Sequence, residues 1–340
     1  MKKTGLLQPP SSKNDSGQER AVGIEIEFGE LPLTKASNLV QQFLEQRGMT
    51  IEQTAKGRYE NLLKGDPAGD WMIEFDYVYL KKVGREERHD DWRDTAEKGL
   101  AWVAEAVVPV EIVSPPLPLS QLPAIEALLQ KLREAGAKGS SDSIAYAFGM
   151  QLNPELPELD AATILAHLQS FLCLYEWLHQ QTDPDISRRM SNYIDPFPKE
   201  YLSLVLSADY APSLTELIRD YLEFNPTRNR ALDMLPLFRH LNEELVLEYI
   251  ADASLIKARP TFHYRLPGCE LHQTDWGLFA VWNPWVRVEQ LASRPHLLAA
   301  ACADYQQHLD KLFSGFSSEW VTYLTTKVVA DLERDSTTLA

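Results

Sequence analysis

Acidic side chains that alternate with apolar ones are the first candidates for chemistry in this sequence. In the run VGIEIEF at residues 22–28, the alternation places Glu25 and Glu27 on one face of an extended strand. At a strand rise of about 3.3 Å per residue, their carboxylates lie about 7 Å apart. Buried acids this close repel each other unless a positive charge lies beside them. Carboxylates suit magnesium or manganese, so the pair predicts a metal site; the alternative is an edge strand whose acids face water.

The same alternation recurs over residues 70–77, 107–113, 144–153 and 261–266. Set side by side, these strands would form one sheet with an apolar face and a polar, acid-rich face. In residues 144–153, small side chains leave room for a ligand beside the polar groups, or for a closely packed neighbouring segment. The polar face would carry Glu25, Glu27, Glu74, Asp76, Glu111, Gln151, Asn153, His263 and Arg265.

A curved antiparallel sheet with such a polar concave face is suited to binding ATP together with metal ions. The acids would hold the ions, which neutralise the triphosphate and the transferring phosphoryl group. Arginines are expected nearby to bind phosphate oxygens. The polar stretch at residues 225–233 precedes a predicted helix, which favours an anion site, with a solvated capping loop as the alternative. The candidate arginines are Arg188, Arg189, Arg228, Arg230, Arg259 and Arg265.

Helices and connecting segments must position these strands. We predict a polar loop over residues 56–68 and a flexible, Pro- and Ser-rich tail over residues 1–20. Without a Gly/Ser-rich linker, residues 21–335 form one domain of α+β class, with helical elaborations at about 160–255 and 274–335. Apolar periodicity predicts helices near residues 36–47, 120–135, 160–180, 198–207, 212–221, 231–240 and 241–255, and two or three more over 276–334.

Composition narrows the classes of partner. The net charge of −16, from 49 acidic and 33 basic residues, disfavours nucleic acid and anionic membranes. No apolar run is long enough to span a bilayer, and the N-terminal stretch lacks the apolar centre of a secretory signal. The cysteines, Cys173, Cys269 and Cys302, have no metal-ligand spacing. We therefore expect a cytoplasmic protein without a membrane or nucleic-acid partner.

The order of these motifs resembles the amidoligase family, within the glutamine synthetase and γ-glutamylcysteine ligase superfamily. The resemblance begins with residues 23–28, 71–76 and 111–116. The predicted helix at 120–135 and the strands at 149–153 and 261–265 continue it in the same order. Each motif is short, so the specificity comes from the order and spacing of the set.

The resemblance implies a fold, a reaction and site residues. The fold is a glutamine synthetase-like curved antiparallel sheet packed by helices. The reaction uses ATP and Mg²⁺ to phosphorylate a carboxylate, after which an amine attacks the acyl phosphate to give an amide. Glu25, Glu27 and Glu111 match metal-binding acids, and Arg265 matches an arginine on the nucleotide phosphates or the transferred group.

The chain departs from the family pattern on two strands. Gln151 and Asn153 stand where two histidines are common, and His263 stands where a glutamate is common. A glutamine cannot be cationic, and a neutral histidine binds magnesium more weakly than a carboxylate. Two interpretations remain. The protein is a ligase that uses other acids, such as Glu74 and Asp76, in place of the missing family residues, or it is an inactive relative that binds a nucleotide or peptide as the partner of another ligase.

As a ligase, the protein would join small-molecule or peptide substrates, and it could form a homo-oligomer. A general base would deprotonate the amine, with Glu74, Asp76 and His263 as candidates. A phosphotransferase of guanidino-kinase type is a further alternative, since such enzymes have a similar type of sheet but do not form an amide.

Overall fold

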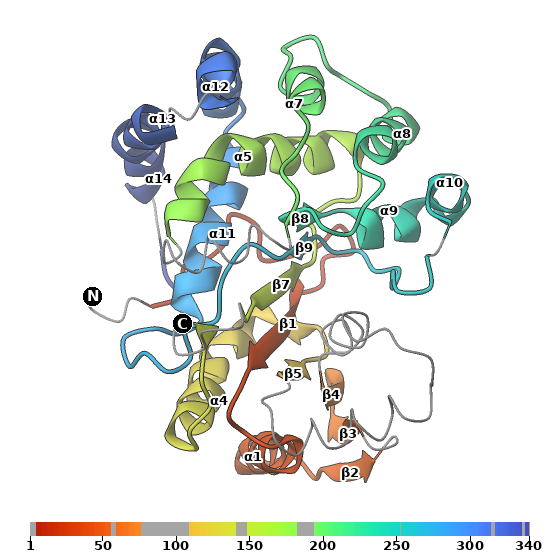
Figure 1. Ribbon diagram of the computed structural model, residues 1–340, viewed down its shortest axis with the longest axis vertical. Helices are drawn as coiled ribbons and strands as arrows, with labels where there is room; N and C mark the ends of the chain where they lie inside the picture. The colour runs from red at the N-terminus through yellow and green to blue at the C-terminus, as the bar shows by residue number, and fades with distance from the viewer. Residues whose placement is uncertain are drawn as a thin grey trace, which may run out of the picture.

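The computed structural model describes residues 5–55, 59–75, 109–140, 148–181, 194–251, 253–313, 317–334 and 337–339 (Figure 1). Its strands are β1 (Ala21–Phe28), β2 (Glu52–Ala55), β3 (Glu60–Asp66), β4 (Gly69–Phe75), β5 (Val110–Val113), β6 (Leu117–Pro118), β7 (Met150–Pro154), β8 (Leu232–Asp233) and β9 (His263–Tyr264).

Helices form most of the rest of the described chain. They are α1 (Leu33–Gln46), a short 3₁₀ turn η1 (Leu119–Gln121), α4 (Leu122–Glu134), α5 (Ala161–Gln180), α7 (Lys199–Val205), α8 (Leu214–Phe224), α9 (Leu235–Leu241), α10 (Glu243–Tyr249), α11 (Phe279–Ala292), α12 (Pro295–Phe313), α13 (Ser317–Tyr323), a π-helical segment η3 (Leu324–Val329) and α14 (Ala330–Glu333).

The strands form one open sheet in the order β2-β3-β4-β5-β1-β7-β9-β8, with β6 paired to the start of β1. Each pairing of neighbouring strands is antiparallel. The fold is therefore of α+β class with an antiparallel sheet, as predicted. β1 lies between β5 and β7, so the strand that carries Glu25 and Glu27 is central.

The two faces of the sheet differ as the alternation predicts. Ile26 pairs with Ile112 on one side and Met150 on the other, and all three are buried. α1 covers this apolar face near β3, where Asn61 donates to Ser37 Oγ at 2.9 Å. Burial of an aliphatic side chain contributes about 1.5–3 kcal/mol, so this face supplies much of the stability of the sheet.

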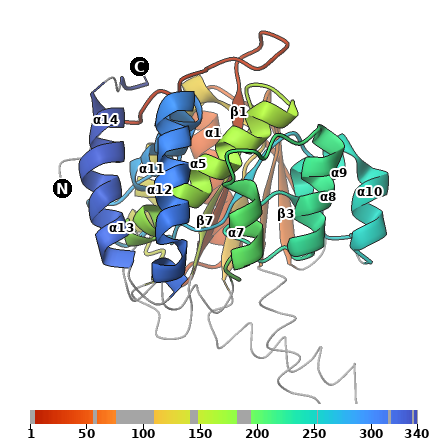
Figure 2. The same ribbon diagram turned by 90° about the horizontal axis from the view of Figure 1, so that it is seen from above.

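α5 and α11 cover the apolar face at the other end of the sheet. The Tyr264 ring of β9 lies 5.9 Å from the Phe171 ring of α5 and 5.3 Å from the Trp285 ring of α11. α12 and α13 pack against α5, and α14 packs against α11, so they form an outer helical layer (Figure 2). The aromatic contacts fix where β9 lies, and β9 carries His263.

The region predicted as a polar loop contains a strand. β3 occupies residues 60–66 and pairs with β2 and β4. Leu62 and Leu63 are consecutive and both buried, so they do not alternate in the way that reveals a half-buried strand. Pairing with two neighbours decides the structure here.

Residues 5–20, part of the predicted flexible tail, are bound to the body of the protein. Leu7 N donates to Asn283 Oδ1 at 2.8 Å, and Trp282 Nε1 donates to the Leu7 carbonyl at 2.7 Å. Leu339 N donates to the Leu6 carbonyl at 2.7 Å, which joins the two terminal segments. Leu6 is buried, so an apolar anchor in a polar stretch holds the segment. The flexible-tail prediction does not fit these contacts.

None of the helices in the described ranges has both the length and the apolar content needed to cross a bilayer.

Candidate active site

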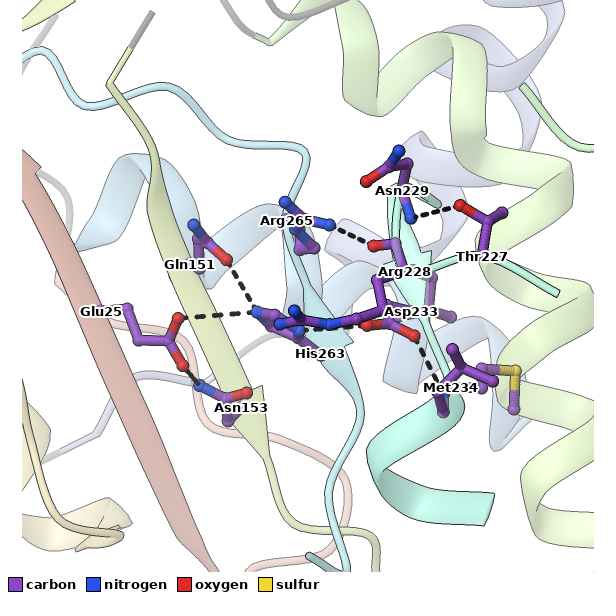
Figure 3. A network of polar contacts seen from close by, with 12 residues as sticks. Glu25, Gln151, Asn153, Thr227, Arg228, Asn229, Asp233, Met234, His263 and Arg265 are labelled. Atoms are coloured by element: carbon purple, nitrogen blue, oxygen red, sulfur yellow. Dashed lines mark hydrogen bonds and ion pairs between the residues drawn. The ribbon is translucent and has the colours of Figure 1, made fainter. Parts of the chain in front are cut away.

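The candidate site lies on the polar face, where β1, β7, β9 and β8 lie side by side (Figure 3). Glu25 and Gln151 are directly opposite each other on β1 and β7, and Asp233 is opposite His263 on β8 and β9. Residues opposite each other in an antiparallel pair lie on the same face. The register therefore brings together side chains that are far apart in the sequence.

His263 lies between two carboxylates. Its Nε2 donates to Gln151 Oε1 at 2.7 Å and lies 3.6 Å from Glu25 Oε2. Its Nδ1 lies 3.5 Å from Asp233 Oδ2. Glu25, His263 and Asp233 thus form a line across the sheet, as Figure 3 shows, and all three are buried. The hydrogen bond at Nε2 fixes the orientation of the ring, and Nδ1 is buried beside Asp233 without a hydrogen-bond partner.

The two amides of β7, Gln151 and Asn153, bind the two central glutamates. Asn153 Nδ2 donates to Glu25 Oε1 at 2.8 Å. Gln151 Nε2 donates to Glu27 Oε1 at 2.7 Å, and Gly149 N donates to Glu27 Oε2 at 2.8 Å. An amide donates at every pH, whereas a neutral histidine can equally present an acceptor. These hydrogen bonds therefore orient both carboxylates.

A row of acids continues from Glu27 across the neighbouring strands. Glu27 is opposite Glu111 on β5, Glu111 is opposite Glu74 on β4, and Glu74 is opposite Glu60 on β3. Opposite residues have Cβ atoms about 5 Å apart, and like charges at that separation repel each other. All four are partly exposed, so cations can reach them. We call these four residues the acid row.

Three of the predicted arginines lie beside Glu25, His263 and Asp233. Arg259 Nη2 lies 3.5 Å from Glu25 Oε1. A guanidinium nitrogen of Arg265 donates to the backbone carbonyl of Arg228, which joins those two residues. Asp233 and Glu25 act electrostatically on Arg228, as do the positive charges of Arg259 and Arg265. We call Arg228, Arg259 and Arg265 the arginine cluster.

Arg230 lies elsewhere and binds its own loop. Its Nε donates to Asn225 Oδ1 at 2.8 Å, and its other nitrogens donate to the carbonyls of Pro196 and Phe224. The guanidinium carbon lies 5.5 Å from the centre of the Phe197 ring. These contacts use the whole guanidinium group for packing, so the structure separates Arg230 from the arginine cluster.

Ionisation within the site follows from these contacts. Burial alone raises the pKa of Glu25, but the charge and hydrogen bond of His263, the charge of Arg259 and the hydrogen bond from Asn153 outweigh it and hold that pKa well below its usual range. Burial lowers the pKa of Arg228, and the charges of Arg265 and Arg259 lower it further against Asp233 and Glu25. The site is thus a concentrated set of opposed charges.

The predicted metal ligands Glu25, Glu27 and Glu111 have different surroundings in the structure. Within the described ranges, no three His, Cys, Asp or Glu side chains form a group that could hold a metal ion. The oxygens of Glu25 already face Asn153, Arg259 and His263, which fits a metal poorly. Glu27 and Glu111 are directly opposite each other and carry the carboxylates that a hard cation prefers, and both oxygens of Glu27 also accept hydrogen bonds from the neutral donors of Gln151 and Gly149. The metal site at Glu25, Glu27 and Glu111 therefore stays a prediction, with Glu27 and Glu111 as the described pair that could hold Mg²⁺.

Asp233 is the site residue that sequence reasoning missed as a functional side chain. It lies at the end of the polar stretch 225–233, which drew attention only for its arginines. Its Oδ1 accepts from Leu235 N at 3.0 Å at the start of α9, while Oδ2 has no hydrogen-bond partner. A fully buried carboxylate with a free oxygen beside a histidine is visible only in three dimensions. Asp76, Arg188 and Arg189 lie outside the described residues.

The fold and the site together define an α+β protein whose antiparallel sheet carries, on one face, an acid row next to a cluster of arginines. A family model described as "Putative amidoligase enzyme" matches residues 18–287. The match covers most of the 340 residues, so the chain belongs to this amidoligase family. The resemblance seen in the sequence is confirmed. Comparisons with curated proteins and with solved structures give no match.

Proposed function

We propose that the protein is an ATP- and Mg²⁺-dependent carboxylate–amine ligase that forms an amide through an acyl phosphate, on a curved, glutamine synthetase-like sheet. The observation that carries the proposal is the juxtaposition of the acid row and the arginine cluster on one face of the sheet of an amidoligase. A ligase of this kind must hold an anionic phosphate and carboxylate beside a cationic amine. The two groups of side chains have the matching charges.

The first half-reaction transfers the γ-phosphoryl group of ATP to a carboxylate oxygen of the acid substrate and releases ADP. Arg228, Arg259 and Arg265 bind the phosphate oxygens and hold the two reactants in line. Gln151 and Asn153 act indirectly, because they orient Glu27 and Glu25. Glu27 and Glu111 would hold Mg²⁺, which would supply positive charge for the negative charge that develops on the phosphoryl oxygens.

In the second half-reaction the amine attacks the acyl carbon, the amide bond forms, and inorganic phosphate leaves. The incoming ammonium must first lose a proton. His263 is buried and its Nε2 already bonds to Gln151 Oε1, so it is poorly placed to reach an incoming amine. Glu74, a partly exposed carboxylate in the acid row, is the better general base among the described candidates. The acid row would also attract the ammonium form of the amine, from a small molecule or a peptide.

The test is a product assay on the full chain with ATP, Mg²⁺ and mixed panels of carboxylates and amines. ADP release that needs both substrates, with a product mass equal to their sum less water, supports the ligase. A product that has only gained a phosphate would indicate a guanidino-kinase type of phosphotransferase instead. Arg259→Gln should lower kcat/KM about ten-fold or more, from loss of one charge-assisted hydrogen bond. Arg219→Gln on the exposed face of α8 is the matched control.

A non-catalytic relative is the second candidate. Glu25 already has cationic partners from the protein, and a histidine stands at residue 263. Both features suit a protein that binds a nucleotide or peptide for a partner ligase without turnover. Calorimetric ATP binding, with no ADP release across the whole panel, would favour this candidate over the ligase.

A further inference from the structure

Two of the three cysteines meet where the outer helix α12 packs against α5. The Sγ atoms of Cys173 on α5 and Cys302 on α12 lie 3.7 Å apart, and both thiols are free. The two residues are 129 positions apart in the sequence, so the packing of the two helices brings them together. Cys269 lies elsewhere, next to the start of β7, where its backbone N–H donates to the carbonyl of Phe148 at 2.8 Å. The fold therefore places one particular thiol beside Cys302.

Packing around the pair holds the two thiols in contact. Ser170 precedes the α5 cysteine by one helical turn, Ala301 adjoins the α12 cysteine, and both side chains are buried. Small side chains at a helix contact let the two helix axes approach each other. Trp320 of α13 donates from Nε1 to the Cys173 carbonyl at 3.1 Å, and its ring lies 5.3 Å from the Tyr305 ring of α12. The thiol pair thus lies at a junction of three helices.

The two thiols differ in accessibility. Cys173 is 0% exposed and Cys302 is 6% exposed, so a small oxidant reaches Cys302 first. The hydrogen bond with Cys302, together with burial, raises the pKa of the Cys173 thiol well above its usual range. Cys173 therefore stays a thiol until its neighbour has reacted, and it is then in place to resolve the oxidised sulfur.

We propose that Cys173 and Cys302 form a reversible disulfide when a peroxide oxidises the protein, and that this bond locks α12 onto α5. In the first step the O–O bond of hydrogen peroxide breaks, one oxygen is transferred to the Cys302 sulfur as a sulfenic acid, and one water leaves. In the second step the Cys173 thiol attacks that sulfur, the S–S bond forms, and the sulfenic oxygen leaves as a second water. Closure to an S–S distance of about 2.05 Å needs an approach of about 1.7 Å.

The bond would act on a helix that supports β9. Phe171 lies two positions before Cys173, and residues two apart on a helix face different sides. The Phe171 ring lies 5.9 Å from the Tyr264 ring of β9. α5 therefore lies between the thiol pair and the strand that carries His263. We expect oxidation to slow the local opening of α5 and α12, whatever reaction the candidate active site catalyses.

The test treats the folded full chain with hydrogen peroxide and locates the product by peptide mapping without reductant. We expect a disulfide between Cys173 and Cys302 of one chain, a mass lower by two hydrogens, and return of both thiols with dithiothreitol. Cys269 should remain a thiol. A folded chain that keeps both thiols, that forms only sulfinic acid at Cys302, or that is linked only to other chains would overturn the proposal.

Oxidation of the urea-unfolded chain is the matched control. Without helix packing, loop closure favours the two cysteines that are closest in the sequence, Cys269 and Cys302. The partner of Cys302 should therefore change from Cys269 in the unfolded chain to Cys173 in the folded one. The same partner in both states would mean that the fold does not select the pair.

Serine variants separate the roles of the thiols. Cys173→Ser should leave a sulfenic acid at Cys302 that dimedone traps, whereas Cys302→Ser should leave Cys173 unmodified at the same peroxide dose. Cys269→Ser should still form the disulfide. Circular dichroism checks that each variant is folded. Modification of Cys173 in the folded Cys302→Ser variant would contradict the order of the two steps.

The stability of the oxidised protein tests whether the bond locks the helices, and this measurement needs no variant. The oxidised chain should have a Tm about 3–6 °C above that of the reduced chain, with slower hydrogen exchange in α12. An unchanged or lower Tm with the disulfide formed would show that the bond does not lock α12 onto α5.

Discussion

At the scale of single residues, the site depends on which groups lie beside each carboxylate and on whether these groups are charged or neutral. Glu25 and Glu27 are two positions apart on β1 and share a face, yet their surroundings differ. Glu25 lies among Asn153, Arg259 and His263, whereas Glu27 faces two neutral donors and lies opposite Glu111. The described donors to Glu27 are neutral, whereas Arg259 and His263 bring positive groups to Glu25, so the two environments differ for a metal ion.

This difference predicts unequal effects on metal binding. Glu27→Gln should weaken Mn²⁺ binding about ten-fold or more, as a direct ligand would. Glu25→Gln removes a charge about 7 Å away, worth about 1.2 kcal/mol against a divalent ion in water, and should weaken binding less than about eight-fold. Electron paramagnetic resonance of Mn²⁺ titrations measures both. A larger effect of Glu25→Gln would show that Glu25 is itself a ligand.

At the scale of elements, a buried ion pair joins the start of β1 to α11. Arg20 donates to both oxygens of Glu289, at 2.8 and 2.7 Å, and both side chains are only 2% exposed. Arg20 also donates to the carbonyls of Glu155 and Ser11, and Trp285 Nε1 donates to Glu289 at 2.7 Å. The pair therefore fixes how α11 lies against the strand that carries the site.

Removing one partner leaves a buried charge unpaired. Glu289→Gln should lower the free energy of unfolding by about 3–5 kcal/mol at pH 7. Urea denaturation followed by circular dichroism measures the loss. The double variant Arg20→Met/Glu289→Leu is the control, and it should be less destabilised than the single variant. Similar losses in both would mean that the ion pair itself, and not the orphaned charge, supplies the stability.

The same pair predicts a pH dependence. Burial alone raises the pKa of Glu289, but the charge and hydrogen bond of Arg20, the charge of His167 and the hydrogen bond from Trp285 outweigh it and lower that pKa below 4.5. The folded protein then binds fewer protons than the unfolded chain. The stabilisation is present above pH 4.5 and is lost as the pH falls through that value towards the folded pKa. Glu289→Gln should flatten this part of the stability–pH curve; an unchanged slope would refute the assignment.

At the scale of the whole molecule, long-range contacts close the chain around the sheet. Leu7 and Thr338 form an isolated antiparallel bridge, so the two terminal segments lie side by side. The outer helix α12 contacts α5 of the inner layer, where the Sγ atoms of Cys302 and Cys173 lie 3.7 Å apart as free thiols.

We expect the contact between the two terminal segments to open locally when Asn283 is replaced. Asn283→Ala removes the acceptor for Leu7 N and the donor to the Gly5 carbonyl, and should cost about 1–3 kcal/mol. Hydrogen exchange should become faster at the amides of Gln8 and Leu339, which bond across the two terminal segments. The amide of Ile26 in β1 is the internal reference and should change little. Equal acceleration at all three amides would show that the termini are not a separate unit.

The sequence by itself determined the elements whose pattern is local. Alternation identified β1, β4, β5 and β7 as strands with one polar face, because successive side chains of a strand point to opposite sides. Helical periodicity and the Asp160 cap identified α5, whose Thr163 N–H bonds to that carboxylate at 2.7 Å. The ordered motifs also gave the amidoligase family.

Only the tertiary structure decided which side chains meet. His263 and Gln151 are 112 residues apart, and Arg259 and Glu25 are 234 apart, so no local period relates them. Their contact depends on strand order and register, which are set by burial of the apolar face along the whole chain. For the same reason, the role of Asp233, the separation of Arg230 from the cluster and the ordering of residues 5–20 could not be read from spacing. A local pattern fixes the direction in which a side chain points, and long-range packing fixes what it meets.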